Sequence, residues 1–119
     1  THTDPNDPER LLAALGGPEF AVLAGVCLGA AEAGSPVVLD GLATSVAALI
    51  ATKFSPGLHG WLVASQASRE QVHHIVLAEL GLEALMELRM RAGEGVGACF
   101  GAQMILTGLQ VRRTAARTC

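Results

Sequence analysis

The sequence predicts an α/β domain in which parallel strands alternate with helices. Two short, continuous apolar runs, Val37–Leu39 and Gly60–Ala64, are typical of strands buried on both faces of a parallel sheet. Between and around them, apolar residues recur at helical spacing. Alternating strands and helices imply right-handed crossovers and helices on both faces of the sheet. A chain of 119 residues is long enough for one such domain, which we expect to span residues 1–119.

Start and stop signals set the expected bounds of the helices. Asp7 and Pro8 start the first helix, Gly16 ends it, and a capping box of Ser68 and Gln71 starts a later one. The helices are expected over residues 8–15, 18 to about 34, 43–54, 69–80 and 96–111, and the strands over 37–39, 60–64 and 86–90.

The spacing of apolar residues also predicts which side chains are buried. The second helix is apolar on most sides, so we expect it to lie against the sheet or another subunit. The fourth helix is expected to bury the face that carries Val72, Ile75, Val76 and Leu80. The three methionines, Met86, Met90 and Met104, are expected in the core.

Composition excludes several classes of protein. The net charge is −3 and no basic run interrupts the chain, so a surface for nucleic acid is not indicated. The longest apolar run, Phe20–Ala31, is shorter than the roughly 20 residues of a spanning helix, and the N-terminus lacks a signal-peptide pattern. We expect a cytoplasmic protein without membrane contact, whose residues 1–6 are flexible.

The cysteines do not indicate a disulfide framework or a metal site. Cys27, Cys99 and Cys119 are odd in number and widely spaced, and the first two are expected to be small buried side chains. His73 and His74 are adjacent in a helix, so their side chains diverge and cannot share a metal ion. A structural role is expected for both histidines.

Three polar or glycine-bearing turns follow the predicted strands, at Asp40-Gly41, Ser65–Ser68 and Gly93–Gly97. In parallel sheets the ligand lies beyond the carboxyl ends of the strands, so these turns should converge on a site. Asp40 suits a sugar-hydroxyl acceptor or an acid–base group, and equally a turn residue. Ser65 and Ser68 could donate to phosphate, although capping alone accounts for Ser68. Glu94, between glycines, is either an active-site carboxylate or an ordinary turn residue.

Four motifs in order resemble the C-terminal part of the nicotinate-nucleotide–dimethylbenzimidazole phosphoribosyltransferases, from about Asp7 to Leu109. They are Gly16-Gly17-Pro18-Glu19, Pro36-Val37-Val38-Leu39-Asp40-Gly41, Gly60-Trp61-Leu62-Val63-Ala64-Ser65 and Arg91-Ala92-Gly93-Glu94-Gly95-Val96-Gly97-Ala98. The resemblance implies a Rossmann-like three-layer fold, present here as a partial domain, and a homodimer. It also implies transfer of ribose phosphate from nicotinate mononucleotide to 5,6-dimethylbenzimidazole, which gives α-ribazole 5′-phosphate and nicotinate for the lower ligand of cobalamin.

The resemblance assigns the general base to Glu94. A carboxylate suits this role because the attacking imidazole becomes cationic and must lose its other N–H proton. By the same resemblance, the substrates would be bound by Asp40, Gly41, Ser65, Ser68, Ala92, Gly93 and Gly95. One base suffices for this chemistry, so no metal ion and no cofactor is implied.

Enzymes of that family are about three times longer than this chain. The chain therefore resembles a fragment, a separated subunit or a domain of a larger protein, and we expect little or no transferase activity from it alone. The alternative is a non-catalytic α/β module that binds a nucleotide or a partner, in which Glu94 is only a turn residue.

Overall fold

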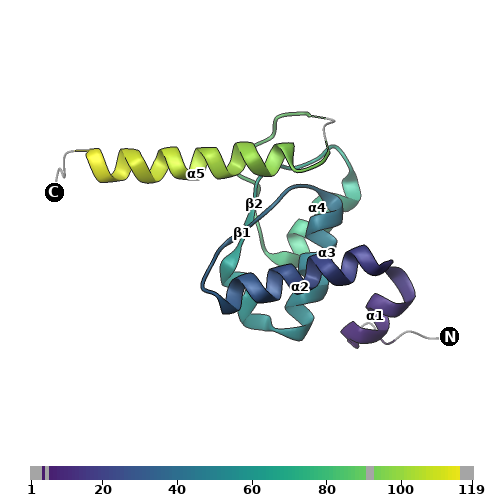
Figure 1. Ribbon diagram of the computed structural model, residues 1–119. Coiled ribbons are helices and arrows are strands. Elements are labelled where there is room, and N and C mark those ends of the chain that lie inside the picture. The colour runs from purple at the N-terminus through teal and green to yellow at the C-terminus, as the bar shows by residue number, and fades with distance from the viewer. Residues whose placement is uncertain (1–3, 5, 91–92, 116–119) are drawn as a thin grey trace.

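The computed structural model describes residues 4, 6–90 and 93–115 of the chain (Figure 1). Two strands, β1 (Val37–Leu39) and β2 (Leu62–Ala64), form a parallel pair in which Val37 lies opposite Leu62. Helix α3 (Leu42–Phe54) and a 3-10 helix, η1 (Pro56–Trp61), connect them. The predicted α/β class with a small parallel sheet is confirmed. The expected flexible segment 1–6 lies mostly outside the described residues.

The third predicted strand, 86–90, is reduced to a single parallel bridge between Gln66 and Met86. Its main chain still follows the sheet, because Leu85 N donates to Ala64 O at 3.0 Å and Met86 N donates to Ser65 O at 3.1 Å. After this bridge, Arg89 has a positive φ of 51°. Such a conformation is outside the β region, so the pairing does not continue.

The helices match their expected bounds closely. They are α1 (Pro8–Leu15), α2 (Pro18–Glu32), α3, α4 (Gln71–Leu80) and α5 (Val96–Thr114). Gly81 ends α4 in the left-handed conformation, with φ of 64°, as a glycine stop predicts. The expected capping box is wrong, because the N-cap is Glu70 without a side-chain bond and the Ser68 hydroxyl lies against His73 instead.

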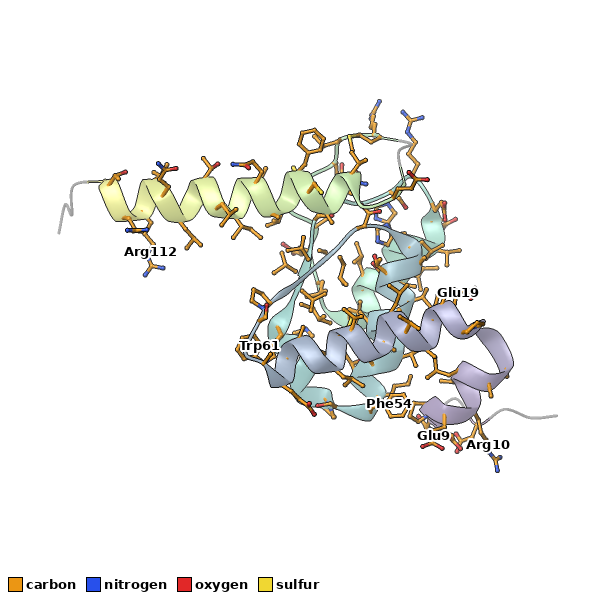
Figure 2. All side chains as sticks on the ribbon, in the orientation of Figure 1. Glu9, Arg10, Glu19, Phe54, Trp61 and Arg112 are labelled. Carbon is orange, nitrogen blue, oxygen red and sulfur yellow. The ribbon has the colours of Figure 1, made fainter. Side chains whose placement is uncertain are left out.

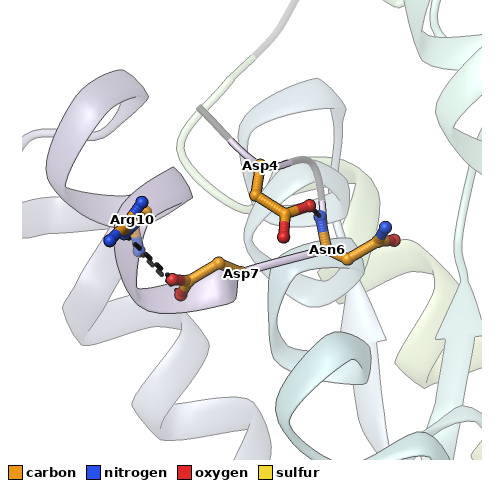
Figure 3. Close-up of polar contacts among 4 residues, drawn as sticks. All are labelled: Asp4, Asn6, Asp7 and Arg10. Carbon is orange, nitrogen blue, oxygen red and sulfur yellow. Dashed lines mark hydrogen bonds and ion pairs between the residues drawn. The ribbon is translucent and has the colours of Figure 1, made fainter. Parts of the chain in front are cut away.

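Asp7 caps the start of α1 with its own side chain (Figure 3). Asp7 Oδ1 accepts the main-chain N–H of Arg10 at 3.2 Å, and Asp7 Oδ2 lies 3.2 Å from Arg10 Nε (Figure 3). Asn6 N donates to Asp4 Oδ1 at 2.9 Å. The ion pair is largely exposed, so the cap contributes more to this helix than the pair does.

Helices cover the sheet from two sides (Figure 1). Alternation along the strands turns Leu39 and Leu62 toward the core, while Val38 lies under Gly101 of α5. The core joins α2, α3, η1, α4 and both strands; its buried members are Ala24, Cys27, Leu39, Ala48, Ala51, Leu58, Leu62, Val76 and Leu80. None of the helices within the described residues is both long and apolar enough to cross a membrane.

The buried face of α4 differs from the expected one. Its buried residues are His73, Val76, Leu77 and Leu80, while Val72 and Ile75 are more than half exposed. A buried, hydrogen-bonded histidine takes the place that an apolar residue was expected to fill. Val76 and Leu80 are in the core as predicted.

Helix α5 packs on the sheet only through its first turns and then extends away from the body, with Arg112 near its far end (Figure 2). Its buried residues are Gly97 and Gly101. Met104 and Cys99 are exposed, which corrects their expected burial, because the helix meets the sheet along its glycine side. Helix α2 buries Ala24 and Cys27 and leaves Val22 and Val26 exposed, so the described chain covers only one side of it.

Candidate functional site

A cavity of about 860 Å³ lies at the carboxyl end of the parallel strands; we call it the strand-end cavity. The structure brings residues from all three predicted turns to it. Its lining comprises Phe20, Asp40, Gly41, Leu42, Ala43, Thr44, Val46, Gln66, Ser68, Arg69, Glu70, Met90, Gly93 and Glu94. Asp40, Gly41, Ser68, Gly93 and Glu94, all candidate site residues, therefore share one cavity. No cluster of His, Cys, Asp or Glu that could hold a metal ion is present among the residues that the structure describes.

The carboxylate of Asp40 caps the last helix from outside that helix. Asp40 Oδ2 accepts the N–H of Gly95 at 3.2 Å, and Oδ1 accepts the N–H of Ala98 at 3.1 Å. Gly95 is the N-cap of α5, so these are N–H groups that the helix itself leaves without acceptors. The negative charge of Asp40 also interacts favourably with the positive end of the α5 helix dipole. Asp40 thus ties the end of β1 to the Gly93–Gly97 turn, and its remaining lone pairs are open to a ligand.

Glu94 occupies a strained position beside this cap. Its φ is 63° and that of Gly95 is 83°, so both central residues of the turn have positive φ, as in a type I′ turn. The turn is closed by Val96 N donating to Gly93 O at 3.4 Å. Glycine adopts this conformation freely, whereas a glutamate there costs about 1 kcal/mol or more. Local preference does not account for Glu94, whose exposed side chain lies at the edge of the cavity.

Two glycines let α5 approach the sheet closely. A Cβ on Gly97 would lie 2.7 Å from Gln66 Cδ, and one on Gly101 would lie 2.7 Å from Ser65 Cβ. The Gln66 side chain packs against Gly97 in the first turn of α5. Its Oε1 is buried and accepts no hydrogen bond within the described residues. These close contacts fix the distance between the sheet and the start of α5, and with it the position of the Glu94 turn.

The start of α3 forms another wall of the cavity. The Thr44 hydroxyl accepts the N–H groups of Asp40 and Gly41, at 3.0 and 3.1 Å, and donates to Gly41 O at 3.0 Å. The first turn of this helix contains no acidic residue. Its positive end therefore faces the cavity without a carboxylate of its own, a setting that favours an anion.

A buried histidine connects this wall with the loop after β2. His73 is 1% exposed, with Nε2 3.1 Å from Ser45 Oγ and Nδ1 2.9 Å from Ser68 Oγ. Ser68 N donates to the same Nδ1 at 3.0 Å, and Ser45 Oγ donates to Gly41 O at 2.7 Å. Burial lowers the pKa of His73 below its ordinary value, and neighbouring His74 lowers that pKa further. The two histidine side chains diverge as predicted, since His74 is exposed.

The other candidate residues lie elsewhere. Ser65 is fully buried, and its hydroxyl donates to Leu39 O at 2.6 Å, so it joins the two strand ends and does not line the cavity. Gly95 faces Asp40, and Ala92 lies outside the described residues. The sequence did not indicate Thr44 and Ser45 as site residues, because their roles depend on what the start of α3 faces. Gly97 and Gly101 are four residues apart in a helix and so lie on one side of it, a spacing that indicates close packing.

Known proteins match most of this chain. The model of a family described as phosphoribosyltransferase matches residues 1–118. The chain is similar to the nicotinate-nucleotide–dimethylbenzimidazole phosphoribosyltransferase of Desulforudis audaxviator, with 42% identity over 92% of this chain and 31% of that protein. It is 45% identical to the protein of the same name from Mycobacterium tuberculosis, over 84% of this chain and 27% of that one.

A solved structure is similar along almost the whole chain. The crystal structure of nicotinate-nucleotide–dimethylbenzimidazole phosphoribosyltransferase from Thermus thermophilus has a TM-score of 0.87 and 37% identity, over 95% of this chain and 34% of that one. This chain thus spans about a third of the length of the relatives it matches. The chain belongs to the phosphoribosyltransferase family in which these relatives are named nicotinate-nucleotide–dimethylbenzimidazole phosphoribosyltransferases.

Proposed function

We propose that the strand-end cavity is part of the active site of a phosphoribosyltransferase that moves ribose phosphate from nicotinate mononucleotide to 5,6-dimethylbenzimidazole. Glu94 is the general base. The observation that carries this proposal is the position of Glu94 in a left-handed conformation, at the edge of the cavity and on a turn held by Asp40. A strained residue at a cavity supports a functional role, because folding alone would favour glycine or asparagine there.

The chemistry needs one carboxylate near the accepting base. One imidazole nitrogen attacks C1′ of the ribose, and the bond from C1′ to nicotinate breaks. The attacking ring becomes cationic, which acidifies its other N–H, and the Glu94 carboxylate accepts that proton. The departing pyridine nitrogen becomes neutral as it leaves, so it needs no acid.

The phosphate of the nucleotide would lie at the start of α3. Among the helix starts at the cavity, that of α5 already has the Asp40 carboxylate and that of α4 has Glu70 as its N-cap, whereas α3 has no acidic residue in its first turn. The half-buried Ser68 and the cation Arg69 line the same region, and both can donate to phosphate oxygens. Asp40 retains lone pairs for a ribose hydroxyl.

Glu94→Gln tests the role of the base while keeping the size of the side chain. The chain would be assayed together with the N-terminal part of the Thermus thermophilus relative, with Glu79→Gln, an exposed carboxylate on α4, as the matched control. We expect product formation to fall at least ~100-fold in Glu94→Gln, the usual scale for a general base, and to be unchanged in the control. Equal activity in the two variants would remove Glu94 from the chemistry.

We also propose that the active enzyme needs chain that this sequence lacks, from a longer protein or a separate subunit, and that it is a homodimer. The large exposed apolar side chains of α5 support an additional protein surface there; they include Phe100, Met104, Leu106, Leu109 and Val111. In the complete enzyme, β1 and β2 would belong to a larger Rossmann-like sheet. A cytoplasmic location suits a substrate as polar as a mononucleotide.

A module that only binds a partner is the second candidate, and the same exposed face of α5 favours it. It predicts assembly with the N-terminal part without product formation. Analytical ultracentrifugation of the native chain and of Glu94→Gln, each mixed with the N-terminal part, measures assembly. The product assay on the same mixtures measures turnover, and the two results together distinguish the two functions. Assembly without turnover in the native chain would support the binding module.

A further inference from the structure

We propose that His73 is a positioning residue that holds the Ser68 loop against the start of α3, and thereby joins the two walls of the cavity that would receive the substrate phosphate. The substrate part of this inference rests on the proposed function. The link itself rests on four hydrogen bonds and does not depend on it.

The hydrogen bonds determine which ring nitrogen carries the proton. Ser68 N–H is an obligatory donor, so Nδ1 of His73 must be the acceptor of that bond. Ser45 Oγ uses its proton to bond Gly41 O, so its lone pair is left to accept from Nε2–H of the ring. Both conditions hold only for neutral histidine with the proton on Nε2.

The surroundings of the ring favour this neutral form. At 1% exposure, burial disfavours the charged ring, and His74 on the same helix adds a like charge when protonated. Glu70 before the helix and Asp40 at the end of β1 oppose this effect, but burial is the largest influence on the pKa of His73. Protonation of Nδ1 would also leave Ser68 N–H without its acceptor.

The link reaches both elements proposed to contact the phosphate. One end reaches Gly41, the N-cap of α3, through Ser45, and the other end holds the main chain and hydroxyl of Ser68. Ser65 and Ala67 are held to the sheet by main-chain bonds to Leu39 and Met86, whereas the main-chain N–H of Ser68 donates to the His73 ring, so His73 restrains the Ser68 end of this segment. When a phosphate arrives, the Ser68 hydroxyl can turn its proton from Nδ1 to the ligand, because Ser68 N–H still satisfies the ring.

Two conservative variants separate the halves of this link. In His73→Asn the side-chain oxygen can replace Nδ1 and keep the bond from Ser68 N–H, while the bond to Ser45 is lost. In His73→Gln the longer amide can donate to Ser45, while the bond to Ser68 is lost. The exposed neighbour provides the matched control, His74→Asn.

The experiment uses NMR on the full chain. In the native chain we expect ring nitrogen shifts of an unprotonated Nδ1 and a protonated Nε2 at pH 7.5. We expect the Ser68 amide to exchange with solvent about tenfold faster in His73→Gln than in the native chain, His73→Asn or the control, which corresponds to one net hydrogen bond. Affinity for nicotinate mononucleotide, with inorganic phosphate as a second probe, should fall by a similar factor in His73→Gln and in His73→Asn, because each variant breaks one end of the link, and should be unchanged in the control.

A proton on Nδ1, or equal exchange of the Ser68 amide in all four proteins, would overturn the proposal. The ring nitrogen shifts are measured on the native chain, so a proton on Nδ1 would overturn the proposal even if a variant did not fold. If the native chain binds neither probe, the proposed phosphate site fails in the isolated chain, while the ring and amide measurements still decide whether His73 positions the loop.

Discussion

Replacing Asp40 tests whether a distant carboxylate holds the Glu94 turn in place. Asp40→Ala removes the acceptors of two N–H groups, those of Gly95 and Ala98, and the charge at the start of α5. Loss of a helix cap costs about 0.5–2 kcal/mol, and loss of a charge at the helix start costs about 0.3–1 kcal/mol more. We therefore expect a loss of about 2 kcal/mol for Asp40→Ala. Asp40→Asn keeps one carbonyl oxygen and should lose about half as much.

The assay is urea unfolding followed through the single tryptophan, Trp61, combined with exchange of the Gly95 and Ala98 amides. Asp7→Ala is the control, because Asp7 caps α1 locally and should leave both amides protected. If Asp40→Ala costs no more than Asp7→Ala and both amides exchange as in the native chain, the cap from β1 does not hold the turn.

Three further predictions concern the same region. Gly101→Ala should destabilise by more than about 1 kcal/mol, because its Cβ would meet Ser65, whereas Gly108→Ala on the same helix meets nothing and should stabilise by about 0.5–1 kcal/mol in urea unfolding. Glu94→Gly should leave the free energy of unfolding equal or higher by up to about 1 kcal/mol, since it relieves a positive φ, yet abolish transferase activity in the complemented assay. His73 has a lowered pKa in the folded chain, so its stabilisation is complete above about pH 6.5 and decreases as pH falls through its folded pKa; urea midpoints at pH 7.5 and 5.0 should differ more in the native chain than in His73→Asn.

Much of the secondary structure follows from local signals. Helix α1 starts where Asp7 and Pro8 predict, and α4 ends where Gly81 predicts, because caps and stops involve residues within one turn of each other. Strand β1 matches its predicted bounds, and its carboxyl end leads to the candidate site as the rule for parallel sheets requires. The sequence was sufficient for these features and for the family.

The third strand and the buried face of α4 could not be predicted in this way. Met86 pairs at one position only, and the positive φ of Arg89 lies outside the β region beyond it. The buried face of α4 includes His73 because Ser45 and Ser68 supply partners for both ring nitrogens. Burial of a polar ring depends on partners from other elements, which periodicity does not reveal.

The α/β class, the ends of most helices, the three turns and the family are encoded by residues close together in the chain, so they can be predicted from the sequence alone. The roles of Asp40 and His73, in contrast, depend on contacts between distant parts of the chain. Asp40 meets N–H groups 55 and 58 residues away, and His73 meets a hydroxyl 28 residues away. Those bonds exist because packing brings two helix starts and a loop to one end of the sheet.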